Sequence, residues 1–230
     1  MTKNRSKRYI IGIAVALLLP LSIFLFTRKL AVGVVHLPKY YALERIDSQA
    51  VAGKTKYDTI YHKAADLQLI NQLGQKVSLN QDLAGKILVA DFIFTHCPGP
   101  CPKLTRNMAM LQKAFKKGDT ALQLISITVD PARDSFPALR AYADKFDVNH
   151  DHWWFLTGDK ERIYNYARNE LHLSVQPGDG GDNDFIHTEK FVVLDQYRYI
   201  RGYYDGADGA EMKRCSDDIV LLLFENKHRK

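Results

Sequence analysis

The most informative segment for the fold is Ile87-Leu-Val-Ala-Asp-Phe-Ile-Phe-Thr-His-Cys-Pro-Gly-Pro-Cys-Pro-Lys-Leu104. Its first part, 87–94, is almost continuously apolar, which is typical of a strand that is buried on both faces of a sheet. After the prolines, apolar residues recur at helical spacing and predict a helix over 102–117. A buried strand that runs through a tight turn into a helix is a building unit of α/β proteins.

Strands and helices also alternate on both sides of this unit. Before it, 67–79 predicts two short strands joined at 71–75. After it, the pattern predicts strands at 122–129 and 153–156, helices at 135–146 and 159–171, a strand pair at 185–194 and 197–204, and a last helix at 208–224. We therefore expect an α/β domain with a central mixed sheet that is flanked by helices.

Cys97 and Cys101 lie four residues apart, just before the predicted helix. In this position the two thiols can face the same direction, and the positive end of a helix favours thiolates and lowers their pKa. The prolines of the turn stiffen it. The residues alone predict two sulfurs available for redox chemistry or for a metal ion. A structural disulfide or two inert thiols is the plainer alternative.

The N-terminus predicts a membrane anchor. Residues 9–26 are uncharged and mostly apolar, and as a helix they would span ~27 Å, near the thickness of a hydrocarbon core. Four cations precede this run, so the chain from residue 31 onward is expected to cross the membrane. A cleaved signal peptide is the alternative, although its apolar region is normally shorter.

These features predict three parts of the chain. Residues 1–30 form the anchor as a cytoplasmic tail and a transmembrane helix, 31–63 form a stalk, and 64–230 form the soluble domain. We expect a single-pass protein of the inner (cytoplasmic) membrane, with its domain on the periplasmic or other extracytoplasmic side. Thiols meet an oxidising environment there.

The net charge of +6 does not indicate nucleic-acid binding. Residues 1–30 contain six cations and no acid, whereas the other 200 residues hold 26 basic and 26 acidic side chains. The folded part is therefore formally neutral and lacks the electrostatic footprint of a nucleic-acid partner.

Over about residues 66–224 the sequence resembles the SCO (Sco/SenC) family of thioredoxin-like copper-binding factors for cytochrome c oxidase assembly. The resemblance rests on four blocks, which are Phe94-Thr-His-Cys97 with Cys101-Pro102, Thr128-Val-Asp-Pro-Ala-Arg-Asp134, Trp154-Phe-Leu-Thr-Gly158, and His187-Thr188 followed by Phe191-Val-Val-Leu-Asp195. It implies a thioredoxin-like sheet. It also implies one copper ion, as Cu(I) or Cu(II), bound by Cys97, Cys101 and His187.

The resemblance further implies what the protein does and with whom. It implies a membrane-anchored copper chaperone that delivers copper to, or prepares, the dinuclear copper centre of cytochrome c oxidase. Its partners would be the copper-bearing subunit of that oxidase and a copper donor protein. The alternative is a dedicated thiol–disulfide oxidoreductase, in which Cys97 and Cys101 cycle between dithiol and disulfide. A peroxidase with this fold fits the residues less well.

Other candidate residues have plainer interpretations. His96 either tunes the neighbouring thiol or contributes to metal binding, and the sequence leaves this open. Cys215 and Met108 fall on apolar helical stripes and are expected in the core. The pair His150 and His152 is expected to have surface or packing roles, and Asp130 is expected to tie down a loop.

Overall fold

The computed structural model describes residues 3–31, 39–51, 54–115, 120–173 and 188–228. The chain divides into two compact units, Met1–Leu37 and Pro38–Lys230. In the first unit, α1 (Lys3–Ala31) is one continuous helix that contains Pro20. Among the described residues, no helix is both long and apolar enough to cross a membrane. The apolar run 9–26 is thus helical as expected, but the expected membrane span is not supported by this finding.

The second unit is built on a mixed sheet of seven strands in the order β4-β3-β7-β6-β5-β8-β9. These strands are β3 (Gln68–Asn71), β4 (Lys76–Ser78), β5 (Ile87–Ile93), β6 (Leu122–Thr128), β7 (Trp153–Thr157), β8 (Lys190–Leu194) and β9 (Ile200–Asp205). The central strands β5, β6 and β7 run parallel, and the flanking strands pair antiparallel. The expected mixed sheet is confirmed.

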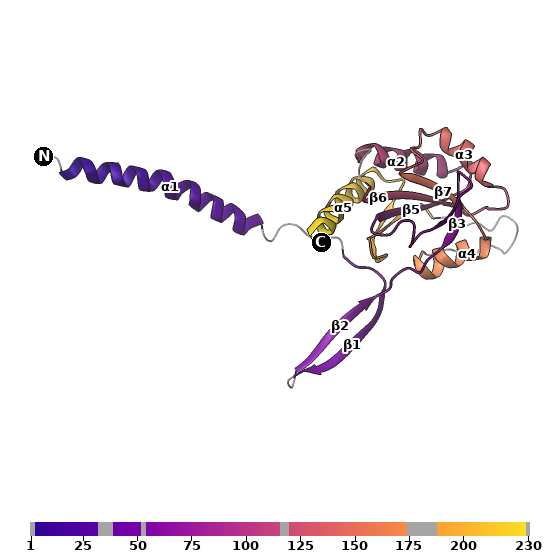
Figure 1. Cartoon of the computed structure of the whole chain (residues 1–230), viewed down its shortest axis with the longest axis horizontal. Helices are drawn as coiled ribbons and strands as arrows, with labels where there is room; N and C mark the ends of the chain where they lie inside the picture. Colours follow the sequence, from indigo (N-terminus) through magenta and orange to yellow (C-terminus); the bar gives the residue numbers. More distant parts are fainter. Residues whose placement is uncertain (1–2, 32–38, 52–53, 116–119, 174–187, 229–230) are drawn as a thin grey trace. The chain divides into compact units, whose positions relative to one another are not determined.

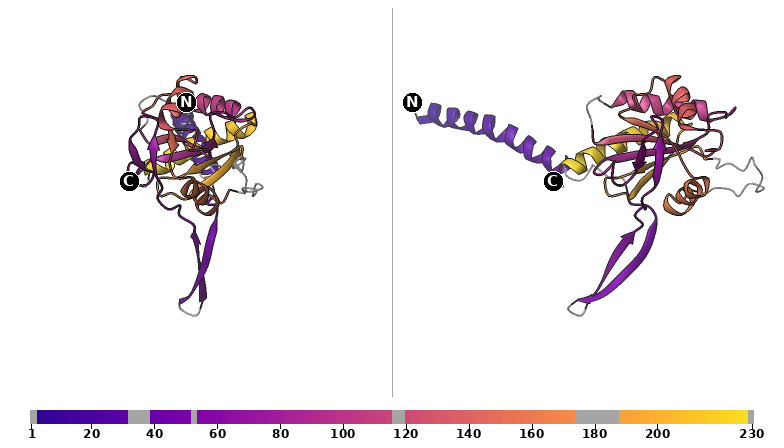
Figure 2. Two further views of the ribbon diagram at one scale, coloured as in Figure 1. Left: turned by 90° about the vertical axis from the view of Figure 1, so that its right-hand side faces the viewer. Right: turned by 45° about the vertical axis from the view of Figure 1, so that its right-hand side comes forward.

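Helices cover both faces of the sheet (Figure 1, Figure 2). One face carries α2 (Cys101–Ala114), α3 (Phe136–Asp144) and α5 (Gly209–His228), and the other carries α4 (Lys160–Asn165) with the π-helical η1 (Tyr166–Glu170). Alternate residues of β5 enter the two cores: Val89 packs on the α2 side, and Leu88 packs on the α4 side. The buried strand 87–94 therefore lies at the centre of the fold, as its composition predicted.

A β-hairpin precedes this domain and was not expected from the sequence. β1 (Leu43–Val51) and β2 (Lys54–Tyr61) pair antiparallel within 31–63, for which the sequence predicts a stalk. The chain leaves and re-enters the domain beside β9, where Tyr41 N–H donates to Ile200 O at 3.0 Å. The two strands carry many polar residues and little apolar alternation, so the periodicity that indicates a strand is weak here.

A buried arginine fastens the β8–β9 turn to the rest of the sheet. Arg198 is 3% exposed and has a φ of 73°. Its guanidinium donates to the carbonyl oxygens of Leu79 and Leu83, both at 2.6 Å, and of Lys86 at 2.9 Å. Because a guanidinium has five donors in a fixed fork, this one side chain satisfies carbonyls of the segment that leads into β5.

Candidate functional site

The end of β5 and the start of α2 place the two cysteines together. The turn after β5 is closed by a hydrogen bond from Cys97 N–H to Phe94 O at 3.3 Å. α2 begins at Cys101, with Pro100 as its N-cap and a proline in its first turn, where a missing N–H costs nothing. Cys97 is half-buried and Cys101 is buried, and both are free thiols. The expected pair of sulfurs at the start of a helix is confirmed.

The Cys101 thiol holds its proton more tightly than the sequence suggested. Burial, together with a smaller contribution from a hydrogen bond with the Cys97 side chain, raises the pKa of Cys101 to about 12. The prediction that the helix start lowers the thiol pKa is therefore wrong for Cys101. Removal of the thiol from water disfavours the thiolate by more than the helix dipole favours it. A metal ion or an oxidation step has to displace this proton.

A pocket of about 410 Å³ opens beside the two thiols. Its walls are mostly apolar and come from the end of β5, the cysteine turn, α2 and the start of β8. They comprise Phe92, Phe94, Pro98, Gly99, Pro100, Leu104, Thr188 and Glu189, together with Cys97 and Cys101. Such a pocket can shield soft sulfur ligands from water while it leaves one side open to a partner.

A buried carboxylate holds the residue that leads into the cysteine turn. Asp134 has no exposed surface in its side chain, and it accepts the Thr95 hydroxyl proton at 2.5 Å and Thr95 N–H at 3.1 Å. It also accepts the Thr128 hydroxyl proton at 2.5 Å. Thr95 and His96 then meet through Oγ1 and Nδ1 at 2.9 Å. Sequence reasoning missed this contact between Thr95 and Asp134, although both residues lie in blocks quoted for the family resemblance.

The loop that carries Asp134 is shaped by Asp130. The carbonyl oxygen of Asp130 accepts the backbone N–H groups of Arg133 at 3.1 Å and Asp134 at 2.9 Å, and its carboxylate pairs with the Arg133 guanidinium. The Asp130 N–H donates to Thr128 Oγ1 at 3.0 Å. The expected role of Asp130 in tying down a loop is confirmed, and the consequence is that Asp134 faces Thr95.

An ionisable group lies inside the sheet on the same side as the cysteines. Asp91 is 1% exposed, and neither of its carboxylate oxygens has a hydrogen-bond partner among the described residues. It alternates along β5 with Val89 and Ile93, which share their core with Cys101. Burial raises the pKa of Asp91 to about 7, although the hydroxyl of Ser126 on the neighbouring strand acts in the opposite direction. The sequence carries a signal for this residue, because Asp91 is the one charge within the apolar run 87–94.

The structure brings together two of the three predicted copper ligands. Cys97 and Cys101 contact each other, whereas His187 lies outside the described residues. Within the part of the chain that is described, no three His, Cys, Asp or Glu side chains form a group that could hold a metal ion. Two adjacent thiols nevertheless fit Cu(I), because this ion is soft and prefers sulfur ligands.

The remaining candidates have structural roles. Cys215 and Met108 have no exposed surface, as predicted, whereas Met110 is exposed. His150 Nδ1 accepts from the Gln72 amide at 2.9 Å, and its Nε2 faces an Asp144 oxygen at 3.3 Å. These contacts confirm a packing role for His150.

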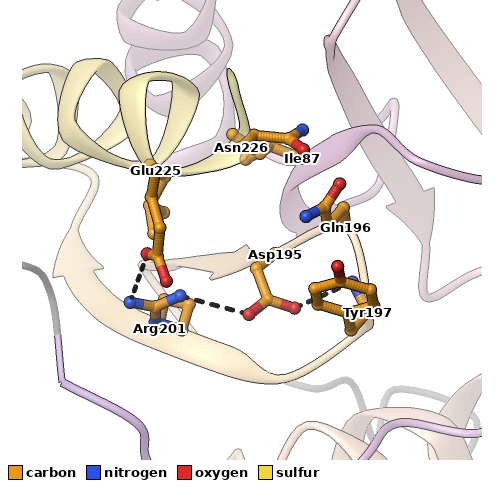
Figure 3. Close-up of a pocket in the computed structure, with 8 residues that line it drawn as sticks. Ile87, Asp195, Gln196, Tyr197, Arg201, Glu225 and Asn226 are labelled. Carbon is orange, nitrogen blue, oxygen red and sulfur yellow. Dashed lines mark hydrogen bonds and ion pairs between the residues drawn. The ribbon is translucent and has the colours of Figure 1, made fainter. Parts of the chain in front are cut away.

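A second, small pocket lies at the other end of β5, beside Ile87 (Figure 3). There Arg201 lies between two carboxylates, with Nη1 3.2 Å from Asp195 Oδ2 and Nη2 2.9 Å from Glu225 Oε2. All three side chains are almost fully buried. The hollow measures about 10 Å³, which leaves room for one water at most. This cluster therefore fastens α5 to the β8–β9 turn and is no ligand site.

The chain is similar in sequence and in structure to known proteins. Residues 56–220 match the model of the SCO1/SenC family. The SCO1 protein homolog of Bacillus subtilis (strain 168) is 31% identical over 172 residues, which cover 74% of this chain and 86% of that protein.

Two solved structures share the thioredoxin-like sheet. BsSco, described as a member of the Sco family of cytochrome c oxidase assembly proteins with a disulfide switch, has a TM-score of 0.61 and 29% identity, covering 70% of this chain and 93% of that chain. Bradyrhizobium japonicum ScoI with copper bound has a TM-score of 0.53 and 25% identity, covering 66% of this chain and 98% of that chain.

Proposed function

Because this chain belongs to the SCO1/SenC family, we propose that it is a copper chaperone that delivers copper to, or prepares, the dinuclear copper centre of a cytochrome c oxidase. The observation that carries the proposal is the pair of free, contacting thiols of Cys97 and Cys101 beside an open pocket. BsSco is described as belonging to a family of oxidase assembly proteins, and a related ScoI binds copper.

In this proposal one copper ion is the cargo, and Cys97, Cys101 and His187 are its ligands. Two thiolates and a neutral imidazole form a soft site for Cu(I), and the imidazole also suits Cu(II). A site with three ligands and an open side can pass its metal by ligand exchange to the copper-bearing subunit of the oxidase. It can be loaded by a copper donor protein in the same way.

Competition for Cu(I) tests the proposal. The full-length protein, purified in mild detergent and fully reduced, is titrated without oxygen against a coloured Cu(I) chelator. We expect one retained copper per chain, its loss in Cys97→Ala and in Cys101→Ala, and weaker retention in His187→Ala. Cys215→Ala is the matched control, since its thiol is buried in α5, and it should bind as the wild type does. Retention that survives both site-cysteine substitutions would contradict the proposal.

Thiol–disulfide exchange is a second candidate, favoured by the unequal exposure of the two cysteines. Cys97 is half-buried and Cys101 is buried, an asymmetry that suits an attacking and a resolving thiol. The Cys97 thiolate would attack a partner disulfide and release one partner thiol. Cys101 would then attack the mixed disulfide and release the second thiol, so two electrons pass to the partner and a Cys97–Cys101 disulfide forms. Accumulation of the mixed disulfide in Cys101→Ala would support this candidate.

We also propose that the protein is anchored in the inner membrane, with its domain on the extracytoplasmic side. Support comes from the sequence alone, namely the uncharged run 9–26 and the four cations that precede it. Membrane fractions washed with carbonate, followed by protease treatment of intact spheroplasts, test this placement. Retention in the washed membranes with a protease-accessible domain is expected, and release by carbonate would contradict it.

A further inference from the structure

His96 lies next to Cys97, and its imidazole is held by a defined chain of hydrogen bonds. Its side chain is 66% exposed, so it does not serve as core packing. The chain of contacts runs from buried Asp134 to Thr95 Oγ1 at 2.5 Å, and from Thr95 Oγ1 to His96 Nδ1 at 2.9 Å. An exposed histidine that is oriented in this way requires an explanation other than packing.

The other hydrogen bonds of Thr95 determine which atom carries the proton in its contact with His96. The Thr95 hydroxyl donates its single proton to Asp134, which accepts from Thr95 twice and from the Thr128 hydroxyl. Thr95 Oγ1 can therefore only accept from the ring, so the proton lies on His96 Nδ1. In the neutral imidazole this leaves the lone pair on Nε2, the nitrogen that makes no described hydrogen bond.

This arrangement is the one that prepares a histidine to bind a metal. Metal-ligating histidines donate their second ring N–H to a carboxylate or another acceptor, which fixes the tautomer and the ring orientation. In His96 the acceptor is Thr95 Oγ1, itself backed by the Asp134 carboxylate. However, His96 is not among the residues that line the cysteine pocket, and the described residues form no closed group of three ligands.

We propose that His96 Nε2 is an outer copper ligand that takes Cu(I) from a donor and passes it to Cys97. This inference rests on the proposed copper function. Copper remains Cu(I) throughout, and no electron moves: the bond to the donor ligand breaks as the bond to Nε2 forms, and that bond is then exchanged for the Cys97 sulfur. His96 thus acts on the rate of copper loading, whereas the three proposed ligands Cys97, Cys101 and His187 set the equilibrium affinity for copper.

Stopped-flow mixing measures the rate of copper loading separately from the equilibrium affinity for copper. The full-length reduced protein is mixed without oxygen with the Cu(I) complex of bicinchoninate, and the loss of its colour is followed. We expect His96→Ala and His96→Asn to load about tenfold more slowly than the wild type, with unchanged equilibrium affinity. The asparagine amide can still donate to Thr95 but offers no imidazole nitrogen. His172→Ala removes another exposed imidazole as the control and should load at the wild-type rate.

Three outcomes would overturn the inference. Wild-type loading in His96→Ala would show that Nε2 takes no part. Wild-type loading in His96→Asn would assign His96 a structural role through Thr95. An equal loss of rate and equilibrium affinity would make it a permanent ligand. Each of these leaves the copper function intact, whereas a wild-type protein that retains no copper at equilibrium refutes the proposed function and this inference together.

Discussion

Thr95 and Asp134 are joined by two hydrogen bonds, since the Asp134 carboxylate accepts both the hydroxyl proton and the backbone N–H of Thr95. The two residues are 39 positions apart in the sequence. One belongs to the turn that carries the cysteines, and the other belongs to the loop after β6. This contact fixes the direction in which the chain leaves β5, and thereby the start of the turn on which the copper proposal depends.

We expect Asp134→Asn to destabilise the protein by about 3 kcal/mol. The Asp134 carboxylate accepts hydrogen bonds from Thr95 and Thr128, and in the variant an amide nitrogen, which cannot accept, would replace one of its oxygens. Chemical unfolding in urea measures the change. The control is Asp217→Asn, which breaks the exposed ion pair with Lys213 and should cost about 0.5 kcal/mol or less. Equal unfolding midpoints of the two variants would show that the Thr95–Asp134 contact contributes little.

The raised pKa of Asp91 predicts that the free energy of unfolding falls as pH rises. Burial raises its pKa in the folded state to about 7 from an ordinary value of 3.8. Between these values the folded protein keeps the proton and the unfolded chain has lost it, so the free energy of unfolding falls as pH rises through this window. Asp91→Asn cannot titrate, and its stability relative to the wild type should therefore increase from pH 4 to pH 8. A difference that stays constant with pH would contradict the raised pKa.

The cysteines should differ in reactivity. Burial raises the pKa of both Cys101 and Cys215 to about 12, so only a minute fraction of either is thiolate at pH 8. Cys97 is half-buried and more accessible. We expect iodoacetamide to modify Cys97 first, as measured by mass spectrometry of peptides over a time course. Modification of Cys101 at the same rate as Cys97 would be inconsistent with the burial of its thiol.

Arg198 should be essential for stability although it is remote from the cysteines. Arg198→Met leaves the carbonyl oxygens of Leu79, Leu83 and Lys86 without this donor, and we expect a loss of about 3 kcal/mol or more. Thermal and urea unfolding measure it. Arg140→Met, at an exposed ion pair with Asp144, is the control and should change stability little. A loss in Arg198→Met no larger than in the control would refute the role.

The sequence predicted those parts of the fold that depend on local patterns. The apolar run 87–94, the helix after the prolines and the two short strands at 67–79 all appear close to their expected bounds. The hairpin at β1 and β2 was missed because polar residues dominate both strands. Periodicity reports burial, and a hairpin with little burial leaves a weak pattern.

Features of the site that depend on distant residues could not be predicted. The partner of Thr95 follows from how the loop after β6 folds back. The high pKa of Cys101 arises from the packing around its thiol, whereas the sequence displayed only the helix start that acts in the opposite direction. Asp91 was visible as a charge in an apolar strand, but its lack of partners emerges only from the assembled sheet.

We propose that Cys97, Cys101 and His187 hold one copper ion. X-ray absorption at the copper edge identifies these ligands on the reduced full-length protein loaded with one equivalent of Cu(I). We expect two sulfur ligands and one nitrogen ligand, with the nitrogen lost in His187→Ala and kept in His96→Ala. A copper site without sulfur ligands, or one whose nitrogen persists in His187→Ala, would contradict it.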